Sequence, residues 1–224
     1  MRYLAEVTKV GRAANSERGI EDRILQSNPI LESFGNARTL RNDNSSRFGK
    51  FIEINFQSSS GSSFSIVGAT IRTYLLEKVR LCYQCEGERN YHVFYEMIKG
   101  SSLVEAARRG LTSISAFNYL SRSQCEVRKD NVNDAEQYRI LCAAFTTLRF
   151  STADQDLVLD ICAAVMHLGN IRFVEEGEGS TFHQDCALHV AKSCDLLGLD
   201  PAGLQTALTE KFISTRSESY RSDI

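Results

Sequence analysis

The sequence has 224 residues, of which 42% are hydrophobic and 24% charged, with a formal net charge of −2. This length allows one large domain or two small ones, and the apolar fraction is sufficient for a core. The near-neutral charge, without a cluster of basic residues, excludes the electrostatic footprint of a nucleic-acid-binding protein. No run of about 18 or more apolar residues occurs, which excludes a membrane-spanning helix.

The N-terminus and the cysteines indicate a cytoplasmic protein. Residues 1–6 lack a continuous apolar region and a small-residue cleavage site, so secretion is not expected. Seven cysteines is an odd number for a disulfide framework, and we expect reduced thiols. Three of them fall on apolar helix faces, where a free thiol behaves as a small hydrophobe: Cys142, Cys162 and Cys194.

A metal site is the alternative use of the cysteines. Cys82 and Cys85 have the spacing of a redox or zinc pair, and His183 with Cys186 offers a second half-site. Zinc motifs usually need two well-spaced pairs in a small, loop-rich context. We therefore favour separate thiols over a metal site.

In chain order, the first elements are predicted to be helices. Helical spacing of apolar residues predicts that residues 1–10 end a helix, and the polar residues 11–19 interrupt the pattern. Residues 20–34 are again helical, and Gly35 is the expected cap. Pro29 lies inside this segment and is expected to kink or break the helix.

Two strands are predicted next. Residues 51–56 alternate as a strand with Ile52, Ile54 and Phe56 on one face. The serine-rich residues 57–63 suit a hairpin connection, and 64–76 supply a longer strand. A slip in the alternation near Gly68 predicts a β-bulge.

From residue 88 onward the pattern is mostly helical. A first helix ends at Gly100, and a short one spans 102–110. Two longer helices follow, the second capped at 151–152 and ended by Gly169. Three of these helices have a predicted core face. In the helix that ends at Gly100, the face is Tyr91, Phe94, Tyr95 and Ile98. In the two longer helices, the faces are Tyr138, Leu141, Cys142, Phe145 and Leu148, and Leu157, Ile161, Ala164, Val165 and Leu168.

The C-terminal part is predicted to be helical between polar connections. His167, in the last turn of its helix, is expected to face the negative end of the helix dipole, which we prefer to a catalytic role. Residues 173–182 are interpreted as a glycine-broken acidic loop. A helix closed by Gly198 and a final helix opening at 200–201 follow, and the polar residues 214–224 are expected to be loose.

The chemistry-bearing stretch is Asn42 to Lys50, with the sequence NDNSSRFGK. A serine hydroxyl can replace one water on Mg²⁺, which prefers hard oxygen ligands. A guanidinium such as that of Arg47 matches phosphate or carboxylate oxygens in bidentate fashion. Clusters of Asn, Asp, Ser and Gly also make ordinary polar turns, so this chemistry alone leaves both interpretations open.

Residues 28–39 (NPILESFGNART) and 42–51 (NDNSSRFGKF) resemble the switch I region of myosin motor domains. Two later stretches agree with the family in order and spacing: GERNYHVFY at 87–95 and HLGNI at 167–171. The resemblance covers nearly the whole chain, from just after the phosphate-binding loop through switch I and the upper actin-binding subdomain.

The resemblance implies an α/β, mainly helical fold. Residues 1–87 would form part of the nucleotide-binding, central-sheet region, including a β-hairpin. Residues 88–224 would form part of a helical upper actin-binding subdomain. The expected location is cytoplasmic, on the actin cytoskeleton, and light chains and cargo would bind to segments not contained in these residues.

By resemblance, the site residues serve ATP and Mg²⁺. Asn42 would bond the phosphates, and Asn44 belongs to the same nucleotide-binding set. Ser46 would ligate Mg²⁺, and Ser45 would hold the γ-phosphate and the attacking water. Arg47 would pair with a switch II glutamate to close the site. The acidic residues that would face filamentous actin are Glu175, Glu176 and Glu178.

Two functions follow as alternatives. The first is part of an actin-based motor that binds and hydrolyses ATP. The second is a truncated product, inactive as an ATPase, that is inert or only binds actin. The sequence contains no Gly-x-x-x-x-Gly-Lys-Ser/Thr loop and no switch II segment. The backbone amides and the lysine of that loop normally cradle the phosphates. We therefore expect these residues alone to be inactive.

Overall fold

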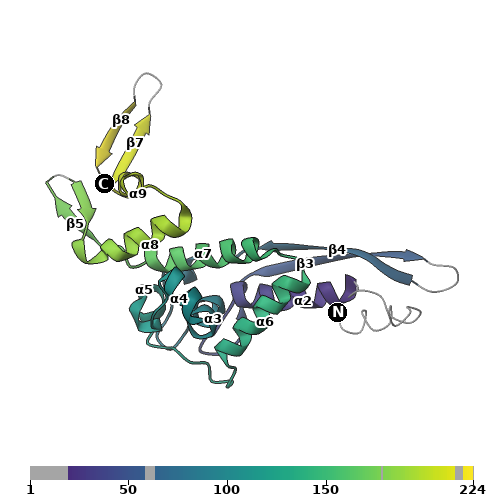
Figure 1. The fold of residues 1–224 in the computed structure, drawn as a ribbon. Coiled ribbons are helices and arrows are strands. Elements are labelled where there is room, and N and C mark those ends of the chain that lie inside the picture. Colours follow the sequence, from purple (N-terminus) through teal and green to yellow (C-terminus); the bar gives the residue numbers. More distant parts are fainter. Residues whose placement is uncertain (1–19, 59–63, 178, 215–218, 224) are drawn as a thin grey trace.

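The computed structural model describes residues 20–58, 64–177, 179–214 and 219–223 (Figure 1). The predicted mainly helical α/β class is confirmed. The predictions for residues 1–19 and for most of the connection at 57–63 lie outside the described residues. The described helices are α2 (Ile20–Gly35), α3 (His92–Gly100), α4 (Leu103–Arg109), α5 (Asn118–Ser121), α6 (Asp134–Thr147), α7 (Thr152–Leu168), α8 (Ala187–Leu197) and α9 (Pro201–Thr209).

The strands form four separate antiparallel pairs within the described residues. Short 3-10 turns connect some of the elements: Lys78–Leu81, Ile114–Ala116 and Gln184–Cys186. None of the described helices is long and apolar enough to cross a membrane. The paired strands are β1 (Asn36–Ala37) with β2 (Ser45–Ser46), β3 (Gly49–Ser58) with β4 (Phe64–Tyr74), β5 (Phe173–Glu176) with β6 (Gly179–Phe182), and β7 (Glu210–Ser214) with β8 (Ser219–Asp223).

The core lies where α3 is enclosed by α2, α6 and α7. The predicted aromatic face of α3 is confirmed, since Tyr95 is fully buried and Ile98 packs at the margin. Leu141 on α6 is also fully buried, and Phe34 of α2 meets Phe145 of α6 edge-on at 6.3 Å. The core therefore crosses the predicted boundary between 1–87 and 88–224, and that division stays a prediction.

Helix α2 continues through its proline, so the predicted break near Asn28 is wrong. Pro29 lies inside one continuous helix of 16 residues. Packing of α2 against α3 and α6 overrides the local preference. Gly35 is the last helical residue, and a Cβ there would stand 2.4 Å from the Phe48 ring. Close packing, rather than a left-handed cap, requires this glycine.

Strands β3 and β4 form a long hairpin that extends away from the helices (Figure 1). The predicted bulge is confirmed: the register shifts after Asn55, which lies opposite Gly68. Ile52 and Ile54 are half-buried as expected, but Phe56 is 46% exposed because it lies toward the projecting end. The hairpin thus leaves two strand edges and several apolar side chains open to solvent among the described residues.

The predicted core face of α7 is partly wrong. Leu157 and Ile161 are exposed, and the neighbouring face is turned inward. Asp160 explains this orientation, because its carboxylate pairs with Arg108 at 2.7 Å and with Arg109 at 2.8 Å on α4. The ion pairs turn a polar stripe toward α4. The buried residues of α7 are Leu159, Ala163, Ala164, Met166 and His167.

The two segments interpreted as loops are hairpins. Residues 173–182 form β5 and β6 around Gly177, which has a positive φ of 63°. Residues 210–214 and 219–223 form β7 and β8, so the expectation of a loose end is wrong for the described part. Cross-strand pairing stabilises both hairpins, and a single segment's polarity does not reveal such pairing.

The helix caps of the C-terminal part are as predicted. Gly198 ends α8 in the left-handed conformation, with φ of 64°. Asp200 accepts a hydrogen bond from the Gly203 amide at 2.7 Å, and Pro201 follows at the first helical position. Figure 1 shows α8 and α9 together with the two C-terminal hairpins at the end of the molecule opposite the β3–β4 hairpin.

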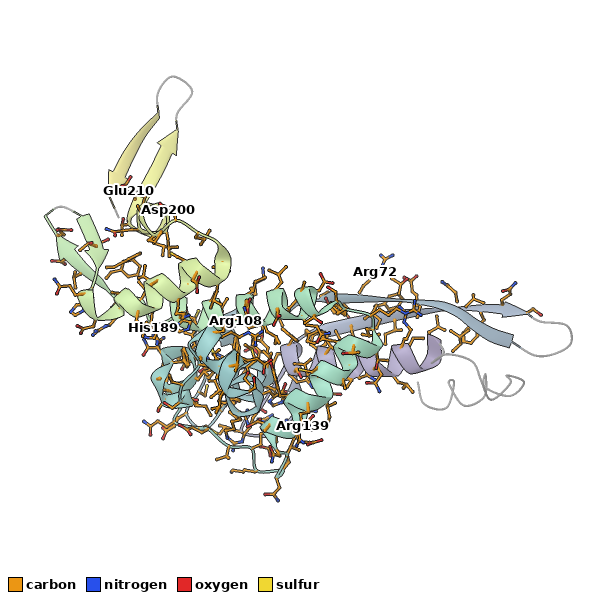
Figure 2. The ribbon with its side chains drawn as sticks, in the orientation of Figure 1. Arg72, Arg108, Arg139, His189, Asp200 and Glu210 are labelled. Atoms are coloured by element: carbon orange, nitrogen blue, oxygen red, sulfur yellow. The ribbon has the colours of Figure 1, made fainter. Side chains whose placement is uncertain are left out.

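His167 lies in the last turn of α7 as predicted, but as a buried, neutral side chain and not as a charged partner of the helix dipole. The side chain is 1% exposed, and burial lowers its pKa. Its Nε2 lies 2.9 Å from the Arg109 carbonyl oxygen, and its Nδ1 lies 2.8 Å from Nδ1 of His189 on α8. This chain of contacts requires an unprotonated acceptor nitrogen, so the neutral pair joins α7 to α8 (Figure 2 labels His189).

Acidification should loosen this junction. Burial lowers the pKa of both His167 and His189, so the unfolded chain binds protons more readily. Their contribution to the free energy of unfolding is present above the ordinary histidine pKa of about 6.5 and is lost as the pH falls below it. Urea midpoints at mildly acidic and neutral pH should therefore differ less in His189→Gln than in the parent chain. The half-exposed His183→Gln serves as control, and an unchanged pH dependence in His189→Gln would contradict the assignment.

The α3–α6 contact gives a second test. Leu141→Ala removes a fully buried side chain and should lower the free energy of unfolding by about 2–5 kcal/mol. The neighbouring Ile140 is 36% exposed, and Ile140→Ala should cost clearly less. Urea denaturation followed by circular dichroism measures both, and equal losses would show that α6 packs through a different face.

Candidate functional site

Residues 38–44 form a tight loop between the two strands of a two-residue ladder, and the stretch singled out in the sequence covers the end of this loop, β2 and the start of β3. Strand β1 pairs with β2, with Asn36 opposite Ser46 and Ala37 opposite Ser45. Ala37 also bridges to Tyr91, ahead of α3. Inside the loop, the Thr39 amide donates to the Asn42 carbonyl at 2.8 Å. The backbone therefore fixes both serines between the end of α2 and the start of α3.

The predicted phosphate and metal ligands lie at the surface of this loop. Ser46 is exposed, and Ser45 is half-buried with its hydroxyl accepting a hydrogen bond from Arg47 Nη1 at 3.1 Å. Asn42 is exposed, and its Oδ1 accepts a hydrogen bond from the backbone N–H of Asn44 at 2.8 Å. That bond uses the side-chain oxygen and not the amide nitrogen, the atom that would donate to a phosphate.

Asn44 is turned away from the serines. Its Nδ2 donates to Glu32 Oε2 at 3.1 Å, and its Oδ1 accepts from Asn36 Nδ2 at 3.0 Å. The same oxygen lies 3.2 Å from Nε2 of His92. The structure therefore brings Ser45 and Arg47 together and places the side chain of Asn44 against α2 and α3.

Arg47 is held by a carboxylate that the sequence analysis did not identify. Its Nε donates to Glu77 Oε2 at 2.5 Å, and Arg80 Nε donates to the same oxygen at 3.0 Å. Arg80 also donates to Glu88 Oε2 at 3.0 Å. Burial alone would raise the pKa of Glu77, but the bonds from the two arginines outweigh it, and the pKa is lowered. The carboxylate is therefore charged at neutral pH.

The backbone reinforces this ion-pair chain. The Glu77 amide donates to the Arg47 carbonyl at 2.9 Å, and the Tyr91 hydroxyl donates to the Glu77 carbonyl at 2.7 Å. The Arg47 amide donates in turn to the Gly35 carbonyl at 2.8 Å. The signal that could have revealed Glu77 is its position after a strand and three residues before Arg80, a spacing at which opposite charges meet.

A second ion pair is fully buried beside the site. Arg89 donates from Nη2 to Asp134 Oδ1 at 2.8 Å, and both side chains are under 5% exposed. The Arg89 guanidinium also lies 3.8 Å from the centroid of the Tyr95 ring. This pair connects the segment before α3 to the start of α6, so its role is to orient those elements.

The other candidate residues lie elsewhere. Glu175 and Glu176 are exposed on β5, and Glu178 lies outside the described residues. Cys82 and Cys85 are exposed, and no group of three or more potential ligands gathers to hold a metal within the described part of the chain. Burial raises the pKa of Cys162 to about 12 and that of Cys142 above its usual value.

Comparison with known proteins identifies the family. The model of the myosin head (motor domain) family matches residues 1–224. The chain belongs to the myosin head family. Myosin-6 of Arabidopsis thaliana is 41% identical over 222 residues, which is 98% of this chain and 14% of that protein. Unconventional myosin-Ic of Danio rerio is 37% identical over 225 residues, 100% of this chain and 21% of that protein.

A third relative, Myosin-51 of Schizosaccharomyces pombe, is 38% identical over 227 residues and is again covered to 14% of its length. The chain thus spans about a seventh of the plant and yeast myosins that it matches. The resemblance derived from the switch-like stretch is confirmed at the level of the family. The match supports the interpretation as part of a motor and does not favour the inert alternative.

The shared carboxylate of this myosin head segment can be tested by charge removal. Glu77→Gln removes the negative charge that the Arg47 and Arg80 guanidinium groups share and should lower the free energy of unfolding by about 1–2 kcal/mol. Glu53→Gln is the control, because its pair with Arg72 is exposed on the hairpin at 3.6 Å. It should change stability by less than about 0.5 kcal/mol. Equal effects in urea titrations would contradict the central place given to Glu77.

Proposed function

We propose that this chain is the switch I and upper actin-binding part of an ATP-hydrolysing, actin-based motor. The observation that carries the proposal is the match of the whole chain to the myosin head family. It is supported by the placement of Ser45, Ser46 and Arg47 on one short segment whose backbone is fixed at both ends. Phosphoryl transfer depends mostly on positioning and charge stabilisation, and this segment supplies groups of that kind.

The residues present suit Mg²⁺ and a triphosphate. Magnesium usually takes one or two protein oxygens together with water and substrate phosphates, and the exposed Ser46 hydroxyl would be the ligand from this chain. When bound, the ion neutralises charge that develops on the phosphate oxygens. Asn42 would donate its amide to the phosphates, and Ser45 would orient the attacking water.

Arg47 would shape the electrostatics of the site. Its guanidinium is already oriented by Glu77 and contacts the Ser45 hydroxyl at 3.1 Å. A preoriented cation beside the reacting phosphate requires little reorganisation during the reaction. In the family, the corresponding arginine pairs with a switch II glutamate, so we propose that Arg47 exchanges Glu77 for that partner when the site closes.

The actin-facing role belongs to the acidic hairpin. Glu175 and Glu176 project into solvent from β5, and Glu178 follows them in sequence. We propose that these carboxylates face basic groups on filamentous actin. Their contribution to affinity would be modest and sensitive to salt, because exposed charges are screened within about 10 Å at 0.1 M ionic strength.

A chimera tests the function directly. This chain would replace the matching segment of the Arabidopsis thaliana Myosin-6 motor, which supplies a phosphate-binding loop and switch II. We expect actin-stimulated ATP hydrolysis, and Arg47→Ala should lower turnover by about 100-fold or more while nucleotide binding persists. Arg41→Ala, a change of the same kind at an exposed position five residues before Ser46, is the control. Full turnover in the Arg47→Ala chimera would exclude the proposed role.

A further inference from the structure

A polar cavity of about 530 Å³ lies between α2, α3 and the segment that leads into α6. The cavity is separate from Ser45, Ser46 and Arg47, none of which lines it. Its volume is within the range of small-molecule sites, roughly 300–1,000 Å³. The polar groups in its wall that matter here are Glu32, Ser33, Asn44, His92, Glu96 and Arg128.

Two side chains in this wall are buried with polar atoms left unpaired. Glu96 is 2% exposed, and its Oε2 has no hydrogen-bond partner among the described residues. His92 is 1% exposed, and its Nδ1 is likewise without a partner there. Leaving such a group unsatisfied is energetically unfavourable. A bound polar molecule that supplies the missing partner would offset this cost.

The charges in the wall leave an excess of carboxylate. Arg128 is already neutralised by Asp130, which accepts from its Nη2 at 2.5 Å and from its Nε at 3.0 Å. Burial and the neighbouring arginines lower the pKa of His92 to about 3, so the imidazole is neutral. Among the described residues, Glu32 receives only the neutral amide of Asn44, at 3.1 Å. The cavity therefore favours a cation.

We propose that this cavity binds a small organic ammonium ion, with the Glu96 carboxylate as its main acceptor and Glu32 as the second. An ammonium group brings three donors to a wall rich in oxygen acceptors. A metal ion fits less well, because no group of three or more His, Cys, Asp or Glu is assembled in the described residues. A diamine carries one ammonium group for each of the two carboxylates.

Binding of such a cation is coupled to a proton. Burial raises the pKa of Glu96 to about 7, with repulsion from Asp134 adding to it. A cation beside Glu96 stabilises the ionised form and expels the proton. The charged and titratable groups that face Glu96 or lie next to it are Glu32 on α2, His92 on α3, Arg89 ahead of α3, Arg128, and Asp134 on α6 with its neighbour Lys99.

The test measures binding of 1,4-diaminobutane to the 224-residue chain by titration calorimetry at pH 6 and pH 8. The diamine keeps both charges across this range, as alkyl amines titrate near about 10. We expect saturable binding that is about tenfold tighter at pH 8, because the ionised fraction of Glu96 rises about tenfold across its pKa. Heats in buffers of different ionisation enthalpy should show release of a proton.

Variants and a neutral analogue make the result specific. The isosteric Glu96→Gln should abolish both the binding and its pH dependence, while Glu32→Gln should weaken binding and leave the pH dependence. Glu136→Gln removes an exposed carboxylate on α6 outside the cavity and should change neither. Circular dichroism confirms that each variant is folded.

Three results would overturn the proposal: no saturable binding to the folded parent chain, equal binding of 1,4-butanediol, or unchanged affinity in Glu96→Gln. The proposal is independent of ATP hydrolysis, so failure of the chimera leaves it standing. It nevertheless bears on the candidate site, because Asn44 lines this cavity and lies two residues before Ser46 on the same loop.

Discussion

The Glu77 carboxylate accepts hydrogen bonds from Arg47 and Arg80, and through this shared oxygen the serine-bearing segment is attached to the helical body. The backbone of Glu77 repeats the connection, since its amide bonds to Arg47 and its carbonyl accepts from Tyr91. Besides this connection, β2 is held by its two-residue ladder and by the hydrogen bond from the Arg47 amide to the Gly35 carbonyl. The geometry of the candidate nucleotide segment therefore depends on one partly buried charge.

The same loop faces two environments. Ser45 and Ser46 form β2 and Arg47 follows them, with its guanidinium 3.1 Å from the Ser45 hydroxyl. Asn44, one residue earlier, is bonded to Glu32 on α2 and contacts His92 on α3. Asn44 lies in the turn that leads into β2, so neighbouring positions of one motif reach different neighbourhoods. A change in the polar cavity would consequently act on the loop through Asn44.

Membership in the myosin head family accounts for the residue types of the loop, and the contacts account for their placement. The family match is the basis of the proposed ATP- and actin-dependent role. The individual contacts show what this chain provides by itself: a preoriented arginine, a fixed pair of serines and a helical core around α3. The core is continuous across the predicted boundary near residue 87, because Ile30 and Phe34 of α2 pack against it.

Sequence reasoning was most successful where the signal is local. The bulge beside Gly68, the left-handed Gly198 and the Asp200–Pro201 start of α9 each depend on the conformational limits of one or two residues. It failed where the partner is distant in the chain. The exposed side of α7 was misassigned because Asp160 is drawn toward Arg108 and Arg109, about fifty positions away.

By itself, the sequence determined the family, the order of the long helices and the identity of the serine–arginine stretch, because motif spacing and apolar periodicity are written along the chain. Only the tertiary structure decided that Glu77 holds Arg47, that His167 is neutral against His189, and that Glu96 faces a cavity. The reason is physical. Charge pairing and burial depend on distances between elements, and a linear pattern contains no such distances until the chain has folded.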